Sequence, residues 1–254
     1  MEKTAWQMPI LEPYKTGHIL IMITGFSLCA FFLYKCRNYD EKKTGKLMFV
    51  IGVLLTLSEV YKELFLATVW QTGYSWGDFP LQLCSMPMYF GIAYPYLRGK
   101  AKDIVTTFLA TFNLIGGFAA VFEPSSSFYS YVTMTCHSVI WHYVLVFMGL
   151  KLWFSTIKID NFKGAEILYL VLGAIAYFLN WLLMGLSQGT MNLFFVGPGV
   201  APIIFFDNIS VKYGPVAESL LFLAVSSGAA FAIYIVGRHL RNVIEDGKIK
   251  TDEI

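Results

Sequence analysis

Three ionisable residues lie together within an otherwise apolar stretch of this 254-residue chain: Glu59, Lys62 and Glu63. Spacings of three and four residues place all three on one face of a helix. Ionisable side chains in apolar, membrane-like surroundings are costly, and they usually face the protein interior and mark a site. The pattern predicts either an internal ion pair that fixes helix packing, or the polar wall of a cavity or a proton relay.

Two histidines, His137 and His142, share a second apolar stretch. Five residues turn an α-helix by about 500°, so the two rings point about 140° apart. This divergence excludes a paired-histidine zinc site of the HExxH kind, and no carboxylate shares a ligand spacing with either ring. We therefore expect no metal and no cofactor. One buried histidine is more often a satisfied core residue than a catalyst, but two in one helix favour a functional role.

Cys84 lies in a third apolar stretch, between Pro80 and Pro87. Proline has no N–H to donate, so Pro87 leaves the carbonyl of Leu83 without its helical partner and predicts a bend. A free carbonyl and a bend beside the thiol favour a polar pocket there. Asn180 adds a further polar side chain within a later apolar stretch.

The composition indicates that the elements positioning these residues belong to a membrane protein. Hydrophobic residues make up 56% of the chain and charged residues 14%, with a mean hydropathy of +0.58. A water-soluble domain carries about 25% charged residues, so a soluble enzyme, a disordered tail and a nucleic-acid-binding module are excluded. The formal net charge of +2 is too small to imply a polyanionic partner. We expect membrane lipids, and no nucleic acid, as partners.

Seven stretches are long and apolar enough to cross a bilayer core of about 30 Å as helices of about 20 residues. Lipid offers no partner for unpaired backbone groups, so helices are the only structure expected. The predicted fold class is all-α: a single integral-membrane domain over residues 1–254 with seven transmembrane helices. The expected helices cover residues 18–34, 47–70, 80–97, 104–122, 131–154, 165–186 and 216–236.

Residues 192–206 form an eighth apolar stretch, but glycines and prolines interrupt it. Both residue types disfavour a continuous helix. We therefore expect an outer loop, or a dip into the membrane, rather than a further crossing.

The lysines and arginines fall mainly on one side of these helices. With alternating crossings, 15 of the 19 lie on one side and three on the other, while Lys62 lies inside a helix. The positive-inside rule then places the N-terminus outside and the C-terminus in the cytoplasm of a multi-pass protein of the cell membrane.

The four cysteines form no CxxC pair and predict no disulfide framework. Cys36 lies at the cytoplasmic face in this orientation, whereas Cys29, Cys84 and Cys136 lie within helices. A cysteine in an apolar helix is most often a small packing residue.

Depth in the membrane follows from the helical rise of about 1.5 Å per residue. Helices 80–97 and 131–154 enter from outside, whereas helices 47–70 and 165–186 leave toward the outside. Polar side chains from all four helices therefore meet in the outer half of the bilayer. They are Glu59, Glu63, Cys84, His137, His142 and Asn180. This convergence predicts one polar cavity without naming a reaction.

The residues around Cys84 resemble a known motif. Residues 80–86, PLQLCSM, look like the Leu-Pro-Leu-x-Leu-Cys motif of the bacterial YwaF-like integral-membrane family. The run HYVLVFMGL from His142 is similar to the histidine helix of that family, with Gly149 where a proline is expected. The run NWLLM from Asn180, and Asp207 with YGP at 213–215, resemble the sixth helix and the loop after it. The similarity covers most of the chain from residue 47 onward.

The YwaF-like family is related to eukaryotic membrane proteins regarded as cysteine-dependent phospholipid acyltransferases. The resemblance implies Cys84 as the acyl-accepting nucleophile and His142 as its base. A thioester intermediate splits one hard acyl transfer into two easier steps. His137 does not fall on the motif and is expected to support the site. Depth alone slightly prefers His137 as the base, but helix boundaries inferred from sequence vary by several residues, so we follow the resemblance.

The first functional hypothesis is an integral-membrane enzyme of lipid metabolism that transfers or hydrolyses acyl chains on phospholipid with Cys84 and His142. Glu59 is the candidate to orient the histidine, as the third member of a catalytic triad does. Asn180 or Lys62 is the candidate to bind an oxyanion.

The alternative is a non-enzymatic transporter or small-molecule-binding protein that uses the Glu59/Lys62/Glu63 patch. Intramembrane carboxylates are common along ion and proton paths, which favours this hypothesis. The sequence contains no duplicated helical segments of the kind that many transporters show, which disfavours it. A purely structural membrane protein is the third possibility.

Overall fold

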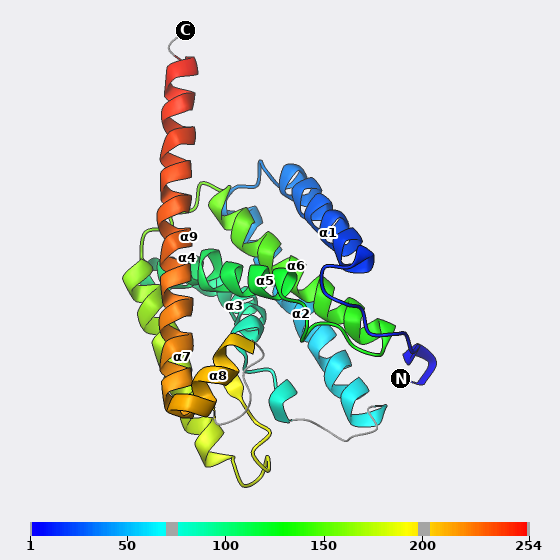
Figure 1. Cartoon of the computed structure of the whole chain (residues 1–254). Helices are drawn as coiled ribbons and strands as arrows, with labels where there is room; N and C mark the ends of the chain where they lie inside the picture. The colour runs from blue at the N-terminus through cyan, green and yellow to red at the C-terminus, as the bar shows by residue number, and fades with distance from the viewer. Residues whose placement is uncertain (1, 70–75, 198–203, 253–254) are drawn as a thin grey trace.

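The computed structural model describes residues 2–69, 76–197 and 204–252, and these ranges form α-helices joined by loops and short 3-10 turns (Figure 1). Within them no strand is present, although an isolated bridge pairs Gln7 with Tyr131. The α-helices are α1 (Thr16–Lys35), α2 (Glu41–Thr68), α3 (Met86–Ala93), α4 (Gly99–Ala110), α5 (Phe112–Phe122), α6 (Val132–Trp153), α7 (Phe162–Leu182), α8 (Ile204–Tyr213) and α9 (Pro215–Asp252). The 3-10 turns are η1 (Glu2–Thr4), η2 (Trp76–Asp78), η3 (Leu83–Ser85), η4 (Tyr94–Tyr96) and η5 (Leu193–Phe195). The predicted all-α class is confirmed.

Five stretches of the described chain are long and apolar enough to cross a membrane. They are Thr16–Lys35, Gly99–Phe122, Val132–Trp153, Phe162–Leu182 and Pro215–Val243. Each overlaps one of the seven predicted helices. The outer faces of α1, α7 and α9 expose large apolar side chains, among them Phe31, Phe178 and Phe231. Extended apolar surfaces of this kind suit contact with lipid rather than water.

The two other predicted crossings, 47–70 and 80–97, are not among these five stretches. Helix α2 has 28 residues and begins at Glu41, six residues before the prediction, because the side chain of Asp40 caps it by accepting from the amide of Lys43 (2.7 Å). It is described to Thr68, so the predicted end at Trp70 lies outside the described residues.

The prediction of one continuous helix over 80–97 is wrong. Residues 83–96 instead form η3, the eight-residue α3 and η4 in succession. Pro87 occupies the first turn of α3, where a missing N–H costs nothing, and Pro95 occupies the same position in η4. Pro87 therefore starts a helix rather than bending one, and Cys84 lies in the short turn before it.

Helix α3 packs directly against the backbone of α2. A Cβ atom added at Gly91 would lie 2.8 Å from the carbonyl oxygen of Met48, and one added at Gly52 would lie 2.5 Å from the amide nitrogen of Ile92. Only glycine permits an approach this close. This close contact fixes the position of α3, and with it the segment 83–96, relative to α2.

The predicted helix 104–122 is also divided, into α4 and α5, at Thr111. Asn113 stabilises the break, because its side-chain amide donates to the carbonyls of Leu109 (3.1 Å) and Leu145 (3.0 Å). Helix α5 then lies against α6 at Gly117, where an added Cβ would be 3.1 Å from the carbonyl oxygen of His142.

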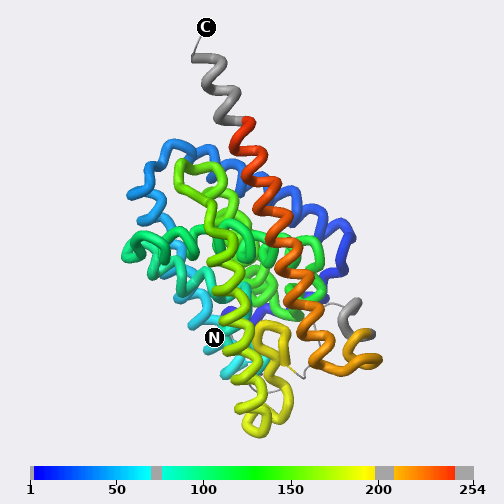
Figure 2. Tube along the Cα trace, turned by 90° about the vertical axis from the view of Figure 1, so that its left-hand side faces the viewer, coloured from blue at the N-terminus to red at the C-terminus, as the bar shows by residue number. Residues whose placement is uncertain are grey.

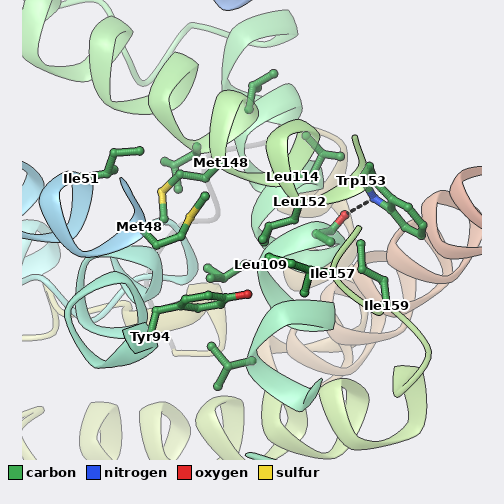
Figure 3. Close-up of a cluster of buried hydrophobic side chains, with 14 of the residues drawn as sticks. Met48, Ile51, Tyr94, Leu109, Leu114, Met148, Leu152, Trp153, Ile157 and Ile159 are labelled. Carbon is green, nitrogen blue, oxygen red and sulfur yellow. Dashed lines mark hydrogen bonds between the residues drawn. The ribbon is translucent and has the colours of Figure 1, made fainter. Parts of the chain in front are cut away.

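The main apolar core lies where α2, α3, α4 and α6 meet (Figure 3). Met48, Tyr94, Leu109 and Met148 are fully buried there. At its edge the indole of Trp153 donates to the carbonyl of Ala110 (2.7 Å), which ties the end of α6 to the end of α4.

Helix α9 is the longest of the described helices and lies beside α7 (Figures 1 and 2), and its C-terminal part projects past the other helices in Figure 1. Arg241 on α9 donates to the carbonyls of Leu152 (3.1 Å), Trp153 (2.8 Å) and Ile157 (2.8 Å). These contacts supply donors to the carbonyls of Leu152 and Trp153 in the last turn of α6, where helical carbonyls lack partners, and to the carbonyl of Ile157 in the loop that follows.

The stretch 192–206 was predicted to form an outer loop or to dip into the membrane. Its first residues are buried within the protein. Leu193 and Phe194 are almost fully buried, and Phe194 and Phe195 have left-handed φ angles of 55° and 53°. Residues 198–203 lie outside the described residues, and α8 begins at Ile204.

Candidate functional site

Lys62 holds both neighbouring glutamates of α2. Its Nζ lies 2.6 Å from Oε1 of Glu59 and 3.3 Å from Oε1 of Glu63. It also donates to the carbonyl of Asp78 (2.8 Å), which attaches η2 to α2. The helical spacing of the three residues therefore produces an ion-pair group on one face.

His137 on α6 joins this group. Its Nδ1 lies 2.8 Å from the hydroxyl oxygen of Ser58, and its Nε2 lies 3.9 Å from Oε2 of Glu59. We call Ser58, Glu59, Lys62, Glu63 and His137 the α2–α6 polar cluster. Two of the predicted helices thus contribute polar groups to one place.

Cys84 lies in η3, beside the polar cluster, and is partly buried. The indole nitrogen of Trp141 donates to its carbonyl oxygen (2.9 Å), which fixes the η3 backbone against α6. Its thiol is close enough to Lys62 and Glu59 for electrostatic interaction with both. The Cys84 backbone therefore lies against Trp141 of α6, the residue immediately before His142, and no contact between the Cys84 thiol and the His142 ring is present among the described residues.

His142 has one ring nitrogen committed to its own helix. Its Nδ1 lies 2.8 Å from the carbonyl oxygen of Ser138. A carbonyl can only accept, so Nδ1 carries the hydrogen and Nε2 of the neutral ring keeps its lone pair. This is the tautomer that a general base acting through Nε2 requires.

A small cavity of about 10 Å³ adjoins His142. It is lined mainly by α1, α5 and α6, with His18, Val121 and Phe128 among the lining residues. A space of this size holds about one water molecule. His18 itself is satisfied, because it accepts from the amide of Tyr14 (2.9 Å) and donates to the carbonyl of Val121 (3.0 Å).

Asn180 was a candidate to bind an oxyanion, but its side chain is already hydrogen-bonded to the backbone of Leu193. It is almost fully buried, and its side-chain amide donates to the carbonyl of Leu193 (3.0 Å) while its oxygen accepts from the amide of the same residue (2.8 Å). Both ends of its side chain therefore hold the loop that contains η5.

Sequence reasoning missed Gln82 and Trp141. The side chain of Gln82 donates to the carbonyls of Gly77 (3.2 Å) and Asn192 (3.0 Å) and accepts from the amide of Phe194 (2.8 Å). It links the η5 loop to the segment that carries Cys84, two residues away. An amide inside an otherwise apolar motif was the signal available for Gln82.

Within residues 2–69, 76–197 and 204–252, no group of three or more histidine, cysteine, aspartate and glutamate side chains is arranged to hold a metal ion. The groups described above comprise a thiol, two imidazoles, an ion-pair group and hydrogen-bonded backbone. Such a set supports nucleophilic and proton-transfer chemistry.

The chain matches a model of a known protein family. The model of the TMEM164 family, a transmembrane family, matches residues 13–238, which include every site residue named above. No curated protein and no solved structure matches the chain.

Proposed function

The chain belongs to the TMEM164 family, and from that premise we propose that it is a membrane enzyme of lipid metabolism that transfers acyl chains on phospholipid through Cys84 and His142. The YwaF-like motif around Cys84 supports this proposal. Membrane lipids would serve as substrates and would enter sideways between helices.

One observation carries the proposal. Trp141 donates to the carbonyl of Cys84 (2.9 Å), so the turn that carries the thiol lies against the α6 turn that carries His142. The hydrogen bond from Nδ1 of His142 to the carbonyl of Ser138 leaves Nε2 as the basic nitrogen. A thiol and a correctly protonated imidazole on touching segments are the two groups that nucleophilic acyl transfer needs.

In the proposed reaction, Nε2 of His142 takes the proton of the Cys84 thiol while the sulfur attacks the ester carbonyl of a phospholipid. The carbon–oxygen bond breaks, and the lysophospholipid leaves with the proton returned by His142. The acyl chain is then held as a thioester on Cys84. In the second half His142 deprotonates an acceptor hydroxyl, which attacks the thioester and releases the thiol.

The α2–α6 polar cluster has a supporting role in this proposal. Lys62 lies beside Cys84 and is held by Glu59 and Glu63, so it supplies positive charge at a fixed place near the developing oxyanion. Glu59 and His137 position Lys62 rather than touching the reacting atoms. Asn180 is left out, because its side chain already holds Leu193.

The proposed topology has seven crossings, with the N-terminus outside and the C-terminus in the cytoplasm of the cell membrane. The two crossings added to the five apolar helices are α2 and the segment 80–97. The 28 residues of α2 span about 42 Å, more than the bilayer core of about 30 Å. The alternation of lysine and arginine between successive loops supports this count.

The alternative function, transport or small-molecule binding through Glu59, Lys62 and Glu63, is supported by the burial of Glu59, which is 5% exposed. A buried carboxylate with a lysine and a histidine beside it suits a proton path. This alternative predicts that Cys84 is dispensable and that Glu59→Gln alters proton-coupled uptake.

The test is to reconstitute the purified chain in vesicles that contain a phospholipid with a labelled acyl chain and an unlabelled lysophospholipid. We expect label to move to the lysophospholipid and a labelled thioester to be trapped on Cys84. Cys84→Ala and Cys84→Ser should abolish transfer, because serine does not form an accessible anion at this site.

Cys136→Ala is the matched control, because Cys136 is exposed on α6 and plays no part in the proposed reaction. It should retain full transfer. Transfer that survives Cys84→Ala would overturn the proposal, and proton-coupled uptake lost in Glu59→Gln would favour the alternative.

A further inference from the structure

Helices α1 and α6 run in the same direction and touch along their length. The hydroxyl of Tyr143 donates to the carbonyl of Ile21 (3.3 Å), and further along both helices the ring of Phe32 lies 6.4 Å from that of Phe147. Residues four positions later lie on the same helical faces. On α6 that residue is Lys151, and after the last residue of α1 it is Cys36.

Lys151 is an unusual residue for its position. It is 1% exposed, and its Nζ has no hydrogen-bond partner in the part of the chain that the structure describes. The amine lies 5.9 Å from the centre of the Tyr39 ring, and it is close enough to Cys36 for electrostatic interaction. An amine buried without a partner is costly, so its retention beside a thiol points to a chemical role.

Cys36 and Tyr39 complete the group. The amide of Tyr39 donates to the carbonyl of Cys36 (3.1 Å) in the turn that follows α1. The electrostatic influence of the Cys36 thiol, followed by the hydrogen bond between the two side chains, raises the pKa of Tyr39. We call Cys36, Tyr39 and Lys151 the Cys36 cluster. It lies at the opposite end of α6 from His137 and is separate from the proposed acyl-transfer site.

We propose that Cys36 is a site of reversible oxidation by hydrogen peroxide, with Lys151 carrying the proton. Lys151 takes the thiol proton while the sulfur attacks one oxygen of the peroxide. The sulfur–oxygen bond forms, the oxygen–oxygen bond breaks, and the departing hydroxide takes the proton from Lys151 and leaves as water. The sulfur is oxidised to a sulfenic acid, the peroxide is reduced, and the amine returns to its neutral form.

The surroundings of Cys36 select a small oxidant. Cys36 is 7% exposed, so its burial excludes bulky reagents and favours an oxidant as small as hydrogen peroxide. Cys29 provides an internal comparison, because it lies on the same helix and is 6% exposed. Its thiol donates to the carbonyl of Tyr143 (3.5 Å) and has no amine beside it among the described contacts.

The test exposes the purified full-length chain in detergent micelles to hydrogen peroxide and follows oxygen addition at each cysteine by peptide mass spectrometry. We expect Cys36 to be oxidised at least about tenfold faster than Cys29, since reactivity follows access to the thiolate. Lys151→Met should reduce the rate at Cys36 to that of Cys29. Lys163→Met is the matched control, because it replaces an exposed lysine on α7 outside the Cys36 cluster, and it should leave the rate at Cys36 unchanged.

Two results would overturn the proposal: equal oxidation of Cys36 and Cys29 in the unmodified chain, or unchanged oxidation of Cys36 in Lys151→Met. The first comparison needs no substitution, so it holds even if a variant fails to fold. Neither result depends on whether the chain transfers acyl groups.

Discussion

The two cysteines with chemical neighbours, Cys84 and Cys36, are positioned in different ways. Cys84 lies in a three-residue turn between broken helical pieces, and individual hydrogen bonds from Trp141 and Gln82 hold its segment in place. Cys36 follows a continuous 20-residue helix, and the packing of α1 along α6 sets its neighbour Lys151. The position of Cys84, in a short turn between helices, therefore depends on a few side-chain hydrogen bonds. The position of Cys36 relative to Lys151 depends instead on how α1 and α6 are aligned along their length.

The largest expected effect is on acyl transfer, which should depend on the region of Cys84 and His142 and not on the region of Cys36 and Lys151. His142→Ala should reduce acyl transfer by about 10²–10⁴-fold, the usual contribution of a general base. Lys151→Met should change it by less than about twofold, because Lys151 lies at the other end of α6. Initial rates of labelled acyl transfer in vesicles would measure both. Equal losses in the two variants would show that the regions are not independent.

The two buried lysines should differ in their effect on stability. Lys62→Met leaves Glu59 without its partner, so we expect a loss of about 3 kcal/mol in the free energy of unfolding. Lys151→Met removes an amine that has no hydrogen-bond partner among the described residues, so it should be neutral or stabilising. Unfolding monitored by circular dichroism in the same detergent would compare them. If the Lys151→Met variant were less stable than the Lys62→Met variant, the conclusion that Lys62 stabilises the fold more than Lys151 would be wrong.

The α2–α3 contact tests how tightly the broken segment is held. Gly91→Ala should cost about 1–3 kcal/mol of stability, because its Cβ would lie 2.8 Å from the carbonyl oxygen of Met48. Gly228→Ala on α9 is the control, since an added Cβ there meets no atom within 4 Å. That change should stabilise the helix by up to about 1 kcal/mol. Equal melting temperatures for the two variants would mean that α3 adjusts freely.

The smallest effect concerns two tryptophans that make the same kind of bond. Trp141→Phe removes the hydrogen bond to the carbonyl of Cys84, and Trp153→Phe removes the one to Ala110. Each should cost about 1 kcal/mol of stability. Only Trp141→Phe should also lower acyl transfer, by about five- to tenfold, because it loosens the turn that carries the thiol. Parallel melting and transfer measurements would show whether stability and activity separate in this way.

Local spacing predicted part of this structure well. The all-α class follows from composition, and the contact of Lys62 with Glu59 and Glu63 follows from helical spacing alone. These features depend on residues that are near each other in the chain, so their pattern is visible in the sequence.

The rest depends on contacts between distant residues. Pro87 indicated a bend in the helix predicted over 80–97, but the close packing of α3 against Gly52 of α2 joins residues that are far apart in the chain. The bonds from Trp141 to Cys84 and from the Phe194 amide to Gln82 join elements whose relative placement no spacing rule gives. The catalytic roles of Cys84 and His142 stay predictions that the proposed variants would test.

Arg241 on α9 has a consequence for the synthesis of the chain. Its guanidinium supplies donors for the carbonyls of Leu152, Trp153 and Ile157, which lie 84 to 89 residues earlier in the chain. The ribosome must therefore translate nearly the entire message before the end of α6 acquires these bonds. A nascent chain released early would keep polar backbone exposed at that terminus, so quality-control proteases should recognise chains truncated before residue 241 more readily than chains truncated just after it.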